Sequence, residues 1–185
     1  MALAERFIAL FGKSDVIVAP SGSCVSMVRH YYRELDLDAR HRRQVGEIAG
    51  KVFEFSEFIV RRMGVTDLEV SFPHRVTYHD SCHLLRELRV RDEPRQLLRA
   101  VKGLELVEME NADRCCGFGG AFSIKFPELS RSIGCEKASF IAATGARYVV
   151  SADAGCLMQI AGTLERSAPG VRAIHLAELL GMHLS

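Results

Sequence analysis

Six cysteines are the residues of this 185-residue chain best suited to chemistry, and four of them follow a defined spacing. Cys115 and Cys116 are adjacent and precede three glycines within four positions, so the backbone there can turn tightly and approach a bound group closely. Cys82 lies 33 residues before Cys115, and Cys156 lies 40 residues after Cys116. Each of these two follows a short apolar run and precedes a helix-like segment. We therefore expect all four thiols to meet at one end of a sheet, around a metal cluster.

The composition is that of an ordinary globular chain, with 48% hydrophobic residues, 25% charged residues and a net charge of +1. Interspersed charges give no electrostatic case for nucleic acid or an anionic membrane as partner. The apolar runs fall short of the roughly 20 residues of a membrane span, and charges interrupt the N-terminal one, which predicts a helix rather than a secretory signal. We expect a cytoplasmic protein, where reduced thiols serve metal or redox chemistry rather than a disulfide framework.

Strands that alternate with helices predict an α/β fold with parallel sheets flanked by helices. Asp80 or Ser81 is expected to cap the helix that follows Cys82. The pattern over residues 45–62 is helical and either runs through or breaks near Phe53. The other expected helices cover residues 3–11, 24–35, 84–88, 95–101, 127–144, 157–166 and a last segment through residue 180. The expected strands cover residues 15–19, 75–79, 104–109, 147–151 and 171–174.

Three pairs of segments match in the same order, which predicts two copies of one module. The matching segments are residues 5–9 with 138–142, residues 16–27 with 148–158, and residues 52–59 with 173–180. Residues 1–63 would then form the C-terminal half of a first cysteine-rich module, and residues 64–185 a complete second one. By this interpretation the chain starts inside its first module. The first half would present an unpaired sheet edge, so we expect that half either to self-associate through this edge or to be mobile.

The cysteine spacing resembles the cysteine-rich Cys-Cys-Gly module that occurs twice in one of the heterodisulfide reductase subunits, in glycolate oxidase iron-sulfur subunits and in lactate utilization protein A. Three local motifs look most like the lactate utilization protein A family, and a fourth resembles the end of its first module. The N-terminal part of the family pattern, with its first lone cysteine and first Cys-Cys-Gly, has no match. The motifs are Tyr78-His79-Asp80-Ser81-Cys82-His83-Leu84, Cys115-Cys116-Gly117-Phe118-Gly119-Gly120, Ser151-Ala152-Asp153-Ala154-Gly155-Cys156 and Pro20-Ser21-Gly22-Ser23-Cys24.

The resemblance implies an iron-sulfur cluster held by Cys82, Cys115, Cys116 and Cys156, with Gly117 and Asp153 beside it. Relatives with a full pattern carry a thiol where this chain has Asp153, and another in place of Ser21. These departures favour an ordinary 4Fe-4S cluster over a five-cysteine double cluster. The implied function is electron transfer within a complex that oxidises L-lactate or another 2-hydroxy acid. Its partners would be the other subunits of that complex, and the chain itself would need no acid-base residues.

Several alternatives stay open at this point. The four cysteines can instead bind zinc in a non-redox scaffold module, although the chain lacks the close cysteine pairs of most zinc sites. Three further interpretations of the cysteines are buried inert thiols, a vicinal disulfide at Cys115-Cys116 and heterodisulfide-type chemistry. Cys135 fits a core thiol better than a ligand. Further candidate metal ligands are Cys24, His79 and His83.

Overall fold

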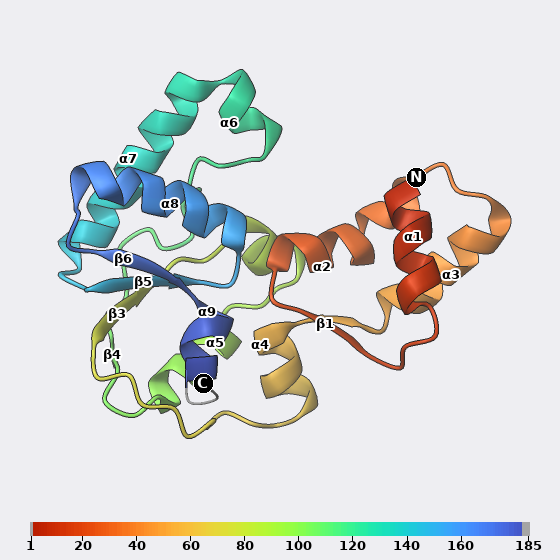
Figure 1. Ribbon diagram of the computed structural model, residues 1–185, viewed down its shortest axis with the longest axis horizontal. Helices are drawn as coiled ribbons and strands as arrows, with labels where there is room; N and C mark the ends of the chain where they lie inside the picture. The colour runs from red at the N-terminus through yellow and green to blue at the C-terminus, as the bar shows by residue number, and fades with distance from the viewer. Residues whose placement is uncertain (1, 183–185) are drawn as a thin grey trace.

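The computed structural model describes residues 2–182 and shows two regions, each containing a parallel sheet (Figure 1). The elements of the first region lie within residues 2–62, and those of the second region within residues 75–181. The sheet of the first region pairs β1 (Ile17–Ala19) with β2 (Val52–Glu54). The sheet of the second region has the order β4 (Glu105–Leu106), β3 (Arg75–Tyr78), β5 (Tyr148–Ser151) and β6 (Arg172–His175). The expected α/β fold with parallel sheets flanked by helices is confirmed.

Helices and short helical turns connect these strands. In the first region they are α1 (Ala2–Phe11), α2 (Gly22–Arg29), the 3-10 turn η1 (Tyr31–Glu34), α3 (Ala39–Ala49), α4 (Phe55–Glu57) and the π-helical turn η2 (Phe58–Arg62). In the second region they are the π-helical turn η3 (His83–Glu87), α5 (Asp92–Ala100), α6 (Ala121–Lys125), α7 (Pro127–Ala143), α8 (Ala154–Ser167) and α9 (Leu176–Gly181).

Helices cover both faces of the four-stranded sheet. In Figure 1, α7 and α8 lie over one face, while α5 and α9 lie on the other. A parallel sheet covered on both faces is built from continuous buried runs rather than from alternating residues. The central strands β3 and β5 show this, because Val76, Tyr78, Val149 and Val150 are all 0% exposed.

The strand order places a crevice at the carboxyl ends of β3 and β5. The chain runs from β3 to β4 on one side of the sheet, and then to β5 and β6 on the other side of β3. In open α/β sheets, ligands bind outside the carboxyl ends of the strands where the strand order reverses in this way. The segments that follow β3 and β5 carry His79, Cys82 and Cys156.

Two clusters of buried apolar side chains form the core. The larger one joins residues of both regions, such as Ile17 and Val25 from the first with Tyr78 and Leu176 from the second. The smaller one lies under α7 and α8 and includes the thiol-bearing residues Cys116 and Cys156. The division of the chain at residues 63 and 64 stays a prediction. The repeat also stays a prediction, although the parallel register pairs Ile17 with Val52 and Val149 with Ala173, as the matched segments require.

Residues 45–62 do not form one helix. The helical pattern ends with α3 at Ala49, and the buried strand β2 follows before α4 begins at Phe55. The sequence leaves open whether the helix continues through Phe53 or breaks near it, and the structure shows the break. β2 forms there because Val52, Phe53 and Glu54 pair in parallel with β1, so a tertiary contact overrides local helix propensity.

Other boundaries also differ from the sequence-based expectations. The helix expected over residues 24–35 ends at Arg29, and the strand expected over residues 104–109 is reduced to β4. The expected capping by Asp80 or Ser81 is wrong. Asp80 accepts two hydrogen bonds of 2.8 Å from Arg95 instead, and the Ser81 hydroxyl is buried without a partner in the described part of the chain.

Within residues 2–182, no helix combines the length and the apolar character that crossing a lipid bilayer requires.

Candidate metal centre

A cavity of about 520 Å³ lies between the two regions and gathers five of the six cysteines. Its lining includes both helix starts, α2 and α8, together with the beginning of η3 and the loop before α6. The four thiols expected to meet do line one cavity, and Cys24 joins them from the first region. The lining cysteines are Cys24, Cys82, Cys115, Cys116 and Cys156.

The parallel sheet explains why distant cysteines meet. Cys82 follows β3 and Cys156 lies in the first turn of α8 after β5. Because β3 and β5 are parallel neighbours, their carboxyl ends lie side by side. The two thiols therefore lie at the crevice where the strand order reverses, which is the usual ligand site of such sheets.

The Cys115-Cys116 loop is held by its glycine and by α7. Gly117 has a φ of +89°, and a Cβ built on it would lie 2.5 Å from the Ser130 carbonyl oxygen, so a larger residue does not fit. The Gly117 carbonyl accepts a 2.8 Å hydrogen bond from the Ser130 hydroxyl, which in turn accepts one of 3.2 Å from Gln159. These contacts fix both thiols at the cavity wall.

The thiols interact with one another. Cys116 contacts Cys115 and Cys156, and the hydrogen bond to Cys116 together with burial raises the pKa of Cys115. The Cys115 contact lowers the pKa of Cys116, but the Cys156 contact and burial outweigh it and raise that pKa to about 12. Burial also raises the pKa of Cys82. Crowded thiols hold their protons unless a cation compensates the thiolate charge, and a bound metal supplies that cation.

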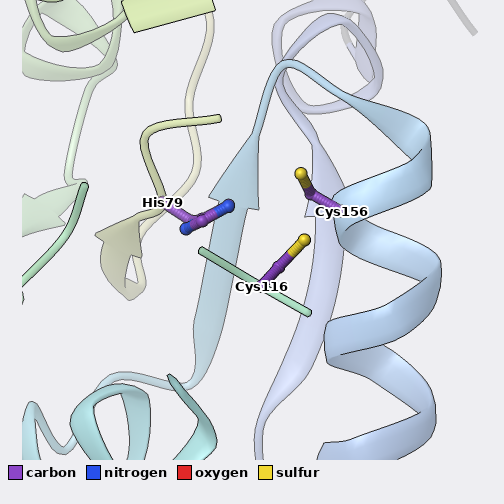
Figure 2. Close-up of side chains that lie close together, drawn as sticks. All are labelled: His79, Cys116 and Cys156. Carbon is purple, nitrogen blue, oxygen red and sulfur yellow. The ribbon is translucent and has the colours of Figure 1, made fainter. Parts of the chain in front are cut away.

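His79 completes an inner group with two of these thiols. One ring nitrogen of His79 and the sulfurs of Cys116 and Cys156 all lie within 4.8 Å of one another. Figure 2 shows the three side chains converging from three separate segments. Burial, and then the positive charge of Lys137, lower the pKa of His79 to about 3, so its imidazole is neutral, the form that ligates metals.

Asp153 links the two regions at the edge of the cavity. Its carboxylate caps α8 by accepting a 3.2 Å hydrogen bond from the Gly155 amide, and it also accepts one of 3.0 Å from the Ser23 amide of α2. Ser21 plays the matching capping role for α2, since its hydroxyl accepts a hydrogen bond from the Cys24 amide. Both positions line the cavity beside the thiols.

His83 and Cys135 lie outside the group formed by His79, Cys116 and Cys156. His83 also lines the cavity, with Nδ1 3.6 Å from the Cys82 sulfur and Nε2 3.9 Å from the Glu87 carboxylate. Cys135 is outside the lining, on α7, and it is exposed rather than in the core. The expectation of a core thiol there is wrong, because the buried face of α7 carries Ala138 and Ile141 instead.

Lys137 was missed by sequence reasoning. It is 1% exposed, and its ammonium donates hydrogen bonds of 2.7 and 3.2 Å to the carbonyls of Asn111 and Ala112, just before the cysteine loop. The signal was present, because Lys137 stands one turn before the buried Ile141 on an apolar helix face. The apolar part of the cavity was also missed. It comes from Met27 and Tyr31, which no motif marks, and from Phe118, which lies in the Cys-Cys-Gly motif but was given no role there.

The donor set fits a metal centre. Thiolates and imidazole are soft or intermediate ligands that suit iron in clusters and zinc, whereas magnesium and calcium prefer oxygen ligands. The cavity is lined by five cysteines, and a ring nitrogen of the buried His79 lies within 4.8 Å of the sulfurs of two of them. The residues therefore match both iron-sulfur and zinc chemistry.

The fold and the cavity define a protein of the cysteine-rich class. The family model described as "Cysteine-rich domain" matches residues 76–161, the segment that holds Cys82, Cys115, Cys116 and Cys156. Single relatives match almost the whole chain. The lactate utilization protein A of Oceanobacillus iheyensis is 43% identical over 97% of this chain and 73% of its own length.

Other relatives with the same name agree. The protein of Bacillus velezensis is 41% identical, and that of Bacillus subtilis is 40% identical, each over 95% of this chain and 74% of the relative. At this identity and coverage, the chain belongs to the lactate utilization protein A family, as its motifs predict.

Proposed function

We propose that this chain is an iron-sulfur electron-transfer subunit of a cytoplasmic complex that oxidises L-lactate or a related 2-hydroxy acid. The observation that supports this most directly is the convergence of Cys82, Cys115, Cys116 and Cys156 on one cavity. The substrate class rests on the relatives, which are named for lactate utilization.

The four thiolates would hold the cluster, with Gly117 and Asp153 beside it and Cys24 at the wall formed by the first region. When bound, an iron-sulfur cluster accepts and releases single electrons at a potential set by its ligands, hydrogen bonds and solvent exposure. The protein therefore has to bind the cluster and shield it from solvent.

The chain's own residues account for the binding and the shielding. The Gly117 amide donates a 3.3 Å hydrogen bond to the Cys115 sulfur, the kind of contact that tunes a cluster. Met27, Tyr31 and Phe118 add apolar surface to the cavity wall beside the thiols. No acid-base residue of this chain is required, because the cofactor carries the redox chemistry.

The state of the cysteines supports the proposed compartment. All six are free, and five lie close together in one cavity. Thiols stay reduced and available for metal binding in the cytoplasm, whereas secreted proteins pair them as disulfides. The partners would be the other subunits of the lactate-oxidising complex.

Anaerobic purification followed by iron and sulfide analysis tests the proposal. We expect iron and acid-labile sulfide in comparable amounts, and visible absorption that dithionite bleaches. Replacing Cys82, Cys115 or Cys156 by serine should each remove most of the cluster. Cys135→Ser is the matched control, because this exposed thiol lies outside the cavity and its loss should leave the iron content unchanged.

Two results would contradict the proposal. One is a colourless protein that contains zinc but no sulfide. The other is a loss of iron in Cys135→Ser with retention in the three cavity variants, which would show that the ligands are assigned wrongly.

A non-redox zinc module is the second candidate, and the inner group favours it. His79, Cys116 and Cys156 with one more thiol give the Cys3His donor set of structural zinc sites. In this case the metal would stabilise the fold and the chain would only assemble partner subunits. Metal analysis of the same anaerobic preparation separates the two candidates.

A further inference from the structure

His79 is buried at a cost to the fold that its surroundings do not offset. Its side chain is 1% exposed, and neither ring nitrogen has a hydrogen-bond partner within residues 2–182. A neutral imidazole carries one donor and one acceptor. Buried polar groups of native proteins are almost always paired, so an imidazole with two free nitrogens calls for an explanation.

The backbone fixes the position of this ring. The His79 amide donates a 2.8 Å hydrogen bond to the Val150 carbonyl, and the His79 carbonyl accepts one of 3.1 Å from the Ser151 hydroxyl. Both contacts tie the residue to β5, the strand that leads to Cys156. The ring is therefore held toward the sulfurs of Cys116 and Cys156, as Figure 2 shows.

His83 provides an internal comparison. It stands next to Cys82, but its ring is 41% exposed at the side-chain level, and both nitrogens have neighbours, the Cys82 sulfur and the Glu87 carboxylate. The two histidines flank the same thiol in sequence. Only His79 is buried, unpartnered and directed toward two cavity sulfurs.

We propose that His79 is a nitrogen ligand of the metal group held by Cys116 and Cys156. The inference rests on the proposed function for the identity of that group, but its geometry is independent of it. The ring nitrogens and both sulfurs are the ligand atoms that zinc and iron accept in mixed sites. An imidazole in place of a thiolate makes a cluster less negative, which raises its reduction potential.

Pulsed electron paramagnetic resonance of the dithionite-reduced protein tests the ligand directly. The full chain is labelled with [15N]histidine and reconstituted anaerobically with iron and sulfide. We expect strong hyperfine coupling to one histidine nitrogen, lost in His79→Leu and kept in His83→Leu. A cluster without strong nitrogen coupling, or coupling that disappears only in His83→Leu, would overturn the inference and leave the proposed function intact.

Cobalt(II) binding to the metal-free chain gives a second readout that does not depend on a cluster. We expect His79→Leu to weaken cobalt binding at least about tenfold and to shift the visible bands of the bound ion. If the protein takes up no cluster but cobalt binding depends on His79, the ligand role stands and the electron-transfer proposal fails. Cobalt affinity that is equal in the wild type and His79→Leu would overturn the ligand role.

Thermal unfolding of the same metal-free proteins separates a ligand from a structural histidine. Leucine fills a similar volume without polar atoms, so His79→Leu should melt at a higher temperature than the wild type. A residue that serves the fold would show the reverse. A lower melting temperature together with unchanged cobalt affinity would assign His79 to the core.

Discussion

The two regions contain the same strand-turn-helix arrangement, but the strand is buried to a different extent in each. In each, a strand leads through a capped turn into a cysteine-bearing helix, as β1 does into α2 and β5 into α8. β5 has a neighbour on each side, and its Val149 and Val150 are 0% exposed. β1 pairs only with β2 within the described residues, and its Val18 is 39% exposed.

The two strands differ in exposure although their sequences are similar. Their burial is therefore set by tertiary contacts and not by local sequence. Val16-Ile17-Val18 and Tyr148-Val149-Val150 read alike as apolar runs. Fully buried apolar side chains contribute their full hydrophobic free energy to folding. Side chains on an edge strand that stay partly exposed contribute less. The first region should therefore depend more on contacts with the second region and with other chains.

The largest expected effect concerns the buried ion pair of the second region. Arg95 and Asp80 make two 2.8 Å hydrogen bonds, and their side chains are 7% and 3% exposed. Arg95→Met would leave the Asp80 carboxylate buried and uncompensated, which should lower the free energy of unfolding by about 3–5 kcal/mol. Urea denaturation measures the loss.

Arg75→Met is the matched control for that variant. Arg75 also makes a 2.8 Å contact with a carboxylate, that of Glu105, but both side chains are about half exposed. Solvent screens such a pair, so its loss should cost less than about 1 kcal/mol. Equal losses in the two variants would show that burial does not set the strength of the Arg95 pair.

The second prediction uses pH to probe the first region. Burial raises the pKa of Glu54, which caps α4, above its usual value. A carboxyl whose pKa is raised by folding stabilises the protein fully below its unfolded pKa, and this contribution disappears as the pH rises through the folded pKa. The wild type should therefore gain stability from this group as the pH falls from 7 toward the pKa of a free glutamate, about 4.3.

Glu54→Gln should remove this gain, so the unfolding free energy of the variant minus that of the wild type should decrease on acidification. Glu105→Gln is a control with the opposite sign, because Arg75 lowers the pKa of Glu105. Denaturation curves at several pH values measure both. A difference for Glu54→Gln that is constant with pH would contradict the raised pKa.

The third prediction compares the two helix caps. Asp153→Ala should cost about 2 kcal/mol, because this carboxylate caps α8 and also holds the Ser23 amide of the first region. Ser21→Ala should cost only about 0.5 kcal/mol, since its single 3.3 Å contact caps α2 alone. Equal costs would mean that the hydrogen bond between the regions contributes nothing.

Much of the site could be predicted from the sequence, because cysteine spacing and strand-turn-helix patterns are local signals. The fold class and the placement of Cys82 and Cys156 at strand ends follow from such patterns. Distant pairing is not a local signal. β2 looked helical until its pairing with β1 was known, and Asp80 looked like a cap although Arg95, 15 residues away, holds it.

The position of Cys24 shows the same limit. In the sequence, Cys24 matches Cys156 through the repeat and is a further candidate metal ligand, but no local signal shows which cysteines lie near it. The structure places it in the cavity of the second region, because the start of α2 packs closely against η3. A Cβ built on Gly22 would lie 2.8 Å from the Cβ of Leu84, so only glycine permits this approach.

The smallest expected effect on stability, but a clear one on assembly, concerns the exposed surface of the first region. Leu3 and Leu10 on α1 are 80% and 63% exposed, and Val18 lies on an edge strand. Exposed apolar residues beside an unpaired edge favour association with another chain. We therefore predict concentration-dependent self-association through the first region, measurable by sedimentation velocity.

Lysine at the edge should weaken this association, because charged side chains on an edge strand oppose pairing. Leu10→Lys combined with Val18→Lys should raise the dissociation constant at least about tenfold, or about 1.4 kcal/mol. Ile124→Lys is the control, since Ile124 is 82% exposed but lies on α6 of the second region, and its change should leave association unaltered. A monodisperse monomer whose backbone amides exchange slowly throughout residues 2–63 would show that the first region is complete without a partner, and the contrast between the two regions would then be one of size alone.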